Sequence, residues 1–195
     1  MDHRAKFGRR RPLHLLLICL LLLGMAILTG CNESNPKDSS TLEPADLLPA
    51  SGEISGWDKE SGGYGEADDY SSLWDLIDGA ADQYIDYGFV EAVQQFYNGT
   101  IGGEDATLEL FISDQGSAGN AAALFDDELV VPPNLTAWDE AGDEAGIDEV
   151  PLFQVSIYLR QDRFFVRVTV DKKNDDVAAL NTAKAFALAV VDGIN

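Results

Sequence analysis

Two adjacent stretches near the C-terminus alternate apolar and polar residues, and this alternation constrains the fold more than any other feature. The apolar positions are Phe153, Val155, Ile157 and Leu159 in the first stretch, and Phe164, Val166, Val168 and Val170 in the second. Successive side chains of a β-strand point to opposite faces, so a period of two predicts strands with one buried side. Gln161 and Asp162 lie between the stretches and predict a two-residue hairpin turn. The chain therefore contains an antiparallel sheet.

An earlier part of the chain predicts a second pair of strands. Residues 89–97 predict a strand that turns at Asn98 and Gly99, and residues 106–113 predict a second strand through the alternation of apolar and polar residues. Residues 51–69 are rich in glycine and acid, and they predict an ordered coil that leads into the first helix.

The clearest helix is predicted over residues 73–87. Wound at about 100° per residue, the segment divides into an apolar and an acidic side. The apolar side carries Leu73, Leu76, Ile77, Ala80, Ala81, Tyr84 and Tyr87, and the acidic side carries Asp75, Asp78, Asp82 and Asp86. Ser72 predicts the start of this helix and Gly88 its end.

Two more helices are predicted, over residues 118–128 and 176–192. Asn174 and Asp175 cap the second, and Gly193 closes it. Hairpin strands interspersed with helices indicate an α+β fold, in which an antiparallel sheet has helices packed on one face as a two-layer sandwich. We expect residues 51–195 to form this single domain.

The N-terminus resembles a bacterial lipoprotein signal peptide. A basic segment is followed by an uncharged apolar run over residues 13–28, interrupted by His14. The run ends in Leu28-Thr29-Gly30-Cys31, which resembles the lipobox where the cysteine is acylated and the chain is cut before it. A plain signal anchor is the alternative, but a 16-residue run is short of the roughly 20 residues that span a bilayer. Residues 1–30 are therefore expected to be a lipoprotein signal peptide, with Cys31 attached to lipid.

The segment after Cys31 is polar and contains three prolines. We expect residues 31–50 to be a lipid-anchored tether that holds the domain near a bacterial cell membrane or outer envelope, outside the cytoplasm.

The mature chain is strongly acidic and lacks histidine. The leader holds five of the 13 basic residues, one of the 34 acids and both histidines, so its removal leaves a formal net charge of −25. Such a surface repels nucleic acid, and it attracts cations or basic proteins, although it also serves as a general solubility device. The absence of histidine from the mature chain excludes catalysis and metal binding through histidine. Because Cys31 is the one mature cysteine, a disulfide within the chain is excluded as well. No cofactor is expected.

Several residues together resemble a family of bacterial secreted proteins and lipoproteins that is known as a domain of unknown function. The resemblance rests on Leu48-Pro49, Gly56-Trp57, and the stretch Leu73-Trp74-x-x-Ile77-Asp78-Gly79-Ala80-Ala81-x-x-Tyr84-x-x-Tyr87-Gly88-Phe89, with weaker matches at Asp114, Gly116, Asn120 and Ala121. It implies one domain and an envelope location, and it implies no catalytic residues.

Two groups of residues are candidate sites. Asp75, Asp78, Asp82 and Asp86 form a carboxylate row on which a hard cation could sit, and the plain alternative is a solvated face of a very acidic protein. The aromatic residues Trp57, Trp74, Tyr84 and Tyr87 could line a groove for a sugar or a quaternary amine, and the plain alternative is that they belong to the core. Neither group identifies a metal with confidence.

The sequence favours a lipid-anchored, non-enzymatic envelope protein whose domain binds a partner protein or a small ligand. A carboxylate-based enzyme that acts on glycans is the alternative, and it requires two carboxyl groups, one of which stays protonated. A structural spacer without a ligand is a third hypothesis.

Overall fold

The computed structural model describes residues 42–195. The predicted signal peptide (1–30), the acylation site Cys31 and the first part of the predicted tether lie outside the described residues.

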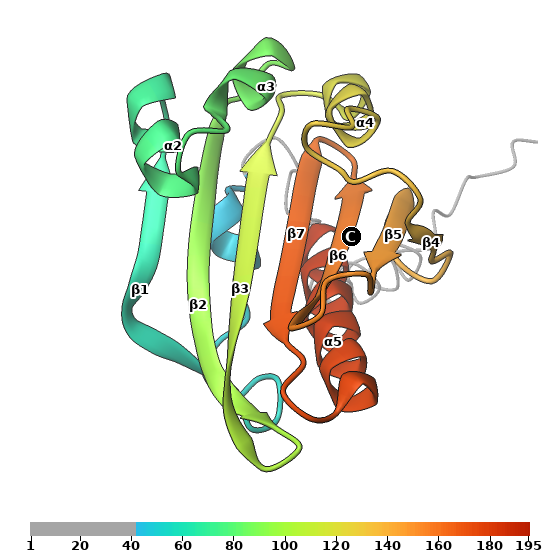
Figure 1. The fold of residues 1–195 in the computed structure, drawn as a ribbon. Coiled ribbons are helices and arrows are strands. Elements are labelled where there is room, and N and C mark those ends of the chain that lie inside the picture. Colours follow the sequence, from blue (N-terminus) through green and yellow to red (C-terminus); the bar gives the residue numbers. More distant parts are fainter. Residues whose placement is uncertain (1–41) are drawn as a thin grey trace, which may run out of the picture. The chain divides into compact units, whose positions relative to one another are not determined.

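The domain is built on one antiparallel sheet of seven strands in the order β1-β2-β3-β7-β6-β5-β4 (Figure 1). The strands are β1 (Asp58–Ala67), β2 (Glu91–Ile101), β3 (Glu104–Asp114), β4 (Thr136–Ala137), β5 (Glu144–Asp148), β6 (Gln154–Gln161) and β7 (Phe164–Asp171). Every neighbouring pair is antiparallel. The predicted α+β class, with helices packed on an antiparallel sheet, is confirmed.

Both predicted hairpins exist, but their turns lie further along the chain than expected. β6 and β7 pair through Gln161 and Phe164, so the turn is Asp162-Arg163. β2 and β3 pair as far as Ile101 and Glu104, so this turn is Gly102-Gly103 and not Asn98-Gly99. Both turn glycines have positive φ, 59° and 85°, which a tight hairpin turn of this kind requires.

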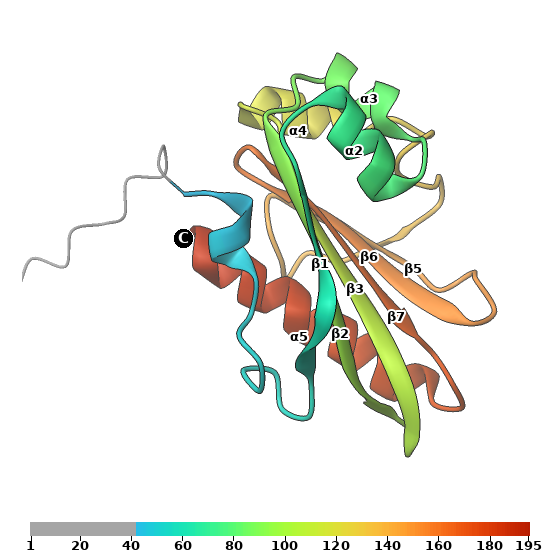
Figure 2. The ribbon, with the colours of Figure 1, turned by 90° about the vertical axis from the view of Figure 1, so that its left-hand side faces the viewer.

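One face of the sheet is covered by the long C-terminal helix α5 (Asp176–Ile194) (Figure 2). The Asp175 carboxylate accepts a hydrogen bond from the Ala178 N–H at 2.9 Å, which confirms it as the helix cap. By length and composition α5 could cross a membrane, but its buried stripe packs on the sheet. That stripe comprises Ala179, Ala183, Phe186, Ala187, Val190 and Val191.

The opposite face is covered at one end by three short helices. These are α2 (Tyr70–Ile77), α3 (Ala81–Asp86) and α4 (Ala118–Phe125), which stand over the upper part of the sheet in Figure 1. Leu73, Ala81, Tyr84 and Leu124 of these helices form a second core that includes Phe111 and Phe165 of the sheet. The predicted two-layer arrangement, with helices on one face, thus holds for α5 and the sheet. The helices α2, α3 and α4 lie on the other face, so helices cover parts of both faces.

The predicted helix over residues 73–87 is two helices, and its predicted start is wrong. Asp78 and Gly79 separate α2 from α3 because both adopt left-handed backbone, with φ of 52° and 96°. Asp69 is the cap of α2, since its carboxylate accepts a hydrogen bond from the Ser72 N–H at 2.8 Å. Gly88 follows α3 with φ of 79°, as expected of a residue that ends a helix.

The last part of the predicted tether belongs to the folded domain. The 3-10 helix η2 (Pro44–Leu47) packs with the α5 core, and Leu42 and Leu47 are buried there. The Tyr97 hydroxyl donates to the Pro49 carbonyl at 2.9 Å. Leu42, Pro44, Leu47 and Pro49 are therefore buried in the domain, and residues 58–67, expected as coil, form the edge strand β1.

Candidate functional site

The predicted carboxylate row is divided between two helices. Asp75 lies on α2, Asp78 lies at the break, and Asp82 and Asp86 lie on α3. All four side chains are exposed. Within residues 42–195 no group of three or more acidic, histidine or cysteine side chains is arranged to hold a metal ion. The structure therefore does not bring the row together as a cation site.

Two of the predicted groove aromatics lie in the two separate cores. Trp57 packs edge-on against Phe186 of α5, with ring centroids 6.0 Å apart. Tyr84 belongs to the second core and packs edge-on against Phe111 and Phe165. Burial raises the pKa of Tyr84 to about 12. These two residues do not share a groove.

The other two aromatics are nearer the surface. Trp74 is 44% exposed and its ring centroid lies 6.0 Å from that of Tyr70. The Tyr87 hydroxyl donates to Asp127 Oδ2 at 3.1 Å, and this hydrogen bond, followed by burial, raises the pKa of Tyr87. The hydroxyl of Tyr87 thus already has a partner in the protein.

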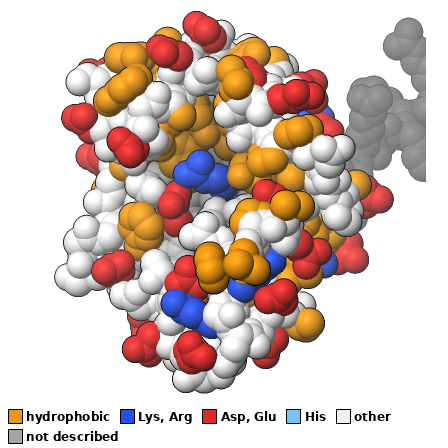
Figure 3. Space-filling view, viewed as in Figure 1, with side chains coloured by type: hydrophobic (Ala, Val, Ile, Leu, Met, Phe, Trp, Pro, Cys, Tyr) orange, Lys and Arg blue, Asp and Glu red, His pale blue; other side chains and the backbone are white. Residues whose placement is uncertain are grey.

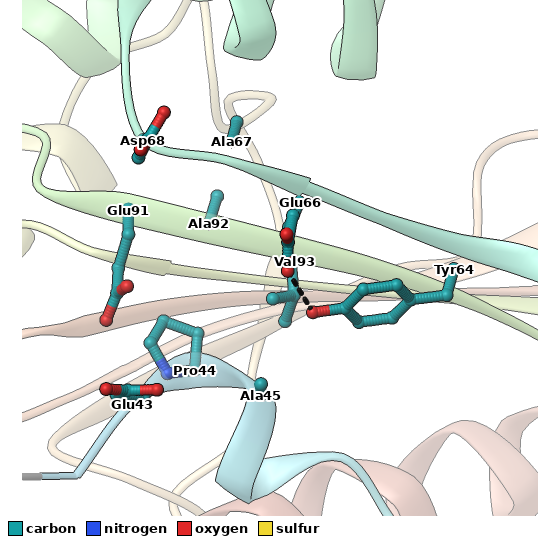
Figure 4. Close-up of a pocket in the computed structure, with 10 residues that line it drawn as sticks. All are labelled: Glu43, Pro44, Ala45, Tyr64, Glu66, Ala67, Asp68, Glu91, Ala92 and Val93. Atoms are coloured by element: carbon teal, nitrogen blue, oxygen red, sulfur yellow. Dashed lines mark hydrogen bonds between the residues drawn. The ribbon is translucent and has the colours of Figure 1, made fainter.

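A different group of residues surrounds a pocket of about 380 Å³ between η2 and the strands β1 and β2 (Figure 4). The lining residues are Glu43, Pro44, Ala45, Tyr64, Glu66, Ala67, Asp68, Glu91, Ala92 and Val93. We call it the acidic pocket, because four of these side chains are carboxylates and none of the described lining residues is a lysine or an arginine.

Pairing of β1 with β2 brings most of these residues together. Glu66 lies opposite Val93 and Ala67 opposite Ala92, so the end of β1 faces the start of β2. Tyr64 and Glu66 are two residues apart, so they emerge on the same face of β1. The packed segment around η2 adds Glu43, and the carboxylates therefore come from three separate parts of the chain.

The electrostatics of the acidic pocket are dominated by negative charge. The Tyr64 hydroxyl donates to Glu66 Oε2 at 2.7 Å, and burial and this hydrogen bond raise the pKa of Tyr64 to about 12. Burial, followed by the charge of Glu43, also raises the pKa of Glu91. Arg163 acts on Glu91 in the opposite direction, but it does not reverse the shift.

Arg163 lies in a neighbouring pocket of about 340 Å³ that shares Glu43 and Glu91 with the acidic pocket. Its Nε donates to Asp114 Oδ2 at 2.6 Å, and its Nη2 donates to the Leu42 carbonyl at 2.6 Å. The guanidinium is thus engaged by Asp114 and by the backbone. Its charge also acts on Glu91 from this neighbouring pocket.

A larger pocket of about 490 Å³ lies beside β4 and β5, between Phe125, Leu135 and Trp138. Two of its three acids, Asp143 and Glu144, form ion pairs with Arg160, at 3.6 and 3.1 Å. Arg160 therefore compensates part of the charge of this pocket within the protein. For this reason we consider the acidic pocket the better candidate for a binding site.

The sequence did not reveal the acidic pocket. The sequence pattern predicts a tether around Glu43 and a coil around Tyr64 and Glu66, and neither prediction places these residues beside Glu91. The one available signal is the spacing of Tyr64, Glu66 and Asp68, which has the period of a strand.

Comparison with known proteins adds no relative. The chain matches no protein-family model, and no curated protein or solved structure is similar enough to count as a match. The resemblance to secreted proteins and lipoproteins that was drawn from the sequence thus stays a prediction.

Proposed function

We propose that this protein is a lipid-anchored envelope protein whose acidic pocket binds a positively charged group, either an ammonium or a guanidinium, of a small ligand or of a basic partner protein. The lipobox-like sequence ending at Cys31 supports the anchor. Attachment through Cys31 is the expected contact with the membrane, and the acidity of the mature chain makes nucleic acid an unsuitable partner.

The observation that carries the binding proposal is the excess of negative charge in the acidic pocket, where the described lining residues include four carboxylates and no lysine or arginine. Burial and then repulsion by the charge of Glu43 raise the pKa of Glu91, and the charge of Arg163 offsets this shift only in part. A bound cation would remove the repulsion. In the larger pocket beside β4 and β5, by contrast, Arg160 lies beside Asp143 and Glu144 and offsets part of their charge.

The shape of the acidic pocket favours an organic cation over a metal ion. Its apolar lining, from Pro44, Ala45 and Ala92, suits an alkyl chain, and its carboxylates suit a charged end. Lysine and arginine side chains combine these two properties. No metal-binding group of three acids exists among residues 42–195.

Isothermal titration calorimetry of the mature chain tests this proposal. The probe is 1,4-diaminobutane, and 1,4-butanediol is its neutral control, both at constant ionic strength. We expect saturable binding of the diamine alone. Glu66→Gln/Glu91→Gln should weaken it at least tenfold. The matched variant Asp126→Asn/Glu128→Gln removes the same charge from exposed positions outside the pockets described above and should change affinity less than twofold. Equal weakening by both variants would mean that the diamine senses only net charge.

The raised pKa of Glu91 also favours a second candidate function, a carboxylate-based hydrolase that acts on glycans. Such an enzyme needs one carboxyl group that stays protonated beside another that is ionised. Among the described residues that line the acidic pocket, Tyr64 is the single aromatic side chain, so the surface that they offer for stacking sugar rings is small. Release of reducing ends from envelope glycan by the wild type, and not by Glu91→Gln, would favour this enzyme over a binding protein.

Acylation is tested separately from binding. Cys31→Ala should leave a full-length precursor and abolish labelling by a palmitate analogue. Label that persists on this variant would refute the lipid anchor without bearing on the acidic pocket.

A further inference from the structure

The connection between β5 and β6 presents an apolar tip to solvent. Val150, Leu152 and Phe153 are 89%, 79% and 76% exposed, and Pro151 between them is exposed as well. Figure 3 shows this side of the molecule, where hydrophobic side chains stand at the surface among acidic ones. Single exposed apolar residues are ordinary, but four in succession on one loop are not. We call residues 150–153 the apolar loop.

The apolar loop is held in place by a buried lysine. Lys172 is 6% exposed, and its ammonium donates to the carbonyls of Glu149 at 2.7 Å and of Pro151 at 3.0 Å. The Lys172 N–H donates to the Phe153 carbonyl at 2.9 Å, and the Val150 N–H donates to Asp148 Oδ1 at 3.0 Å. These bonds fix the backbone of the loop while its side chains remain outside. None of these hydrogen bonds draws the side chains of residues 150–153 toward the core.

We propose that the apolar loop inserts into the surface of the bilayer that carries the lipid anchor, as a second membrane contact. This inference rests on the proposed acylation of Cys31. Leucine and phenylalanine at a loop tip gain free energy from the headgroup and acyl boundary in proportion to the apolar area that they bury.

The length of chain before the folded domain makes this contact possible. Cys31 and Leu42 are 11 residues apart, so at full extension they are separated by at most about 38 Å. A domain of 154 residues has a radius of gyration of about 15 Å. The anchor therefore keeps every face of the domain within reach of the lipid, and insertion becomes an intramolecular step at high effective concentration.

The charge of the domain selects the kind of lipid. The loop itself is uncharged, and the ammonium of Lys172 is occupied by carbonyl groups. The mature chain carries a formal net charge of −25, so anionic headgroups repel the domain around the loop. The apolar loop is therefore expected to insert more readily into a bilayer of zwitterionic lipids than into one of anionic lipids. The loop and α5 lie on opposite sides of the sheet (Figure 2), so this contact would turn the α5 side away from the bilayer.

The test uses the mature, lipid-anchored chain on phosphatidylcholine vesicles. Leu152→Cys receives an environment-sensitive fluorophore, and Leu129→Cys is the matched control, because Leu129 is 77% exposed on a different loop. We expect bromine-substituted acyl chains to quench the probe at residue 152 at least twofold, and the probe at residue 129 not at all. Val150→Ser/Phe153→Ser should reduce the quenching at residue 152, and these exposed changes should leave the melting temperature unchanged.

Flotation of the same samples separates the two proposals. A chain that does not float with vesicles would refute the lipid anchor. A chain that floats while the probe at residue 152 remains as unquenched as that at residue 129 would overturn the insertion of the apolar loop, and it would leave a protein partner as the occupant of this surface.

Discussion

Arg163 and Asp114 form a short, largely buried ion pair that joins the turn before β7 to the end of β3, with 2.6 Å between Nε and Oδ2. Through Nη2, Arg163 also holds the Leu42 carbonyl at 2.6 Å. One side chain thus fixes two strands and the point at which the N-terminal segment joins the domain. Because Glu43 follows directly, this contact also positions one wall of the acidic pocket.

We expect Arg163→Met to lower the free energy of unfolding by about 3 kcal/mol, since it leaves the Asp114 carboxylate without its partner in a site that is poorly solvated. Arg160→Met is the control, because its partners Asp143 and Glu144 are nearly half exposed, and it should cost less than about 1 kcal/mol. Urea denaturation measures both. Similar losses for the two variants would mean that burial does not distinguish these ion pairs.

The break between α2 and α3 gives a second prediction. Gly79 has φ of 96°, and an added Cβ would lie 3.2 Å from Trp74 Cζ2, so Gly79→Ala should destabilise the fold by about 1–2 kcal/mol. Gly119→Ala, inside α4, meets no atom within 4 Å and should be neutral or stabilising by up to about 1 kcal/mol. Thermal unfolding compares them. A neutral Gly79→Ala would indicate that residues 73–87 can form one continuous helix.

The strands that could be predicted are those with one face in a continuous core. Val166, Val168 and Val170 face α5 in β7, and the alternation of such residues with polar ones is directly visible in the sequence. β1 lacks this signal, because nine of its ten residues are partly or fully exposed at the edge of the sheet. The period of two therefore predicts the central strands of the sheet. It does not predict the edge strand β1, which lines the acidic pocket.

The helix predicted over residues 73–87 shows a different limit. The pattern predicts that Leu73 and Tyr84 lie on the apolar side, and both are buried. It predicts that Asp75 and Asp82 lie on the acidic side, and both are exposed. The helical period does not predict the left-handed backbone conformation of Asp78 and Gly79, because that conformation depends on how α2 and α3 pack. The division of the carboxylate row followed from those two residues.

Stability should depend on pH through Glu91. Its pKa is raised in the folded protein above the ordinary value of 4.5, so the folded state binds the proton more tightly than the unfolded state does. The stability that this provides is present at low pH and is lost as pH rises through the folded pKa. Glu91→Gln should therefore be more stable than wild type at pH 7, and the two should converge below about pH 4. A difference that is constant with pH would contradict this assignment.

Calcium should not bind the divided carboxylate row as a dedicated site. Melting temperatures measured during a calcium titration at constant ionic strength should change little and without saturation, and equally in wild type and in Asp78→Asn/Asp82→Asn. A dedicated site would instead give saturable stabilisation, about 2.7 kcal/mol at a hundredfold excess over Kd, that is lost in the double variant.

The central claim, that the acidic pocket binds an organic cation, is tested most directly by the pKa of Glu91 itself. Carbon-detected NMR follows the Glu91 carboxyl during a pH titration, with and without saturating 1,4-diaminobutane. Because a bound ammonium favours the ionised carboxylate, we predict that the diamine lowers the pKa of Glu91 toward its ordinary value, and that 1,4-butanediol has no effect. A pKa of Glu91 that stays raised at every diamine concentration would contradict the claim.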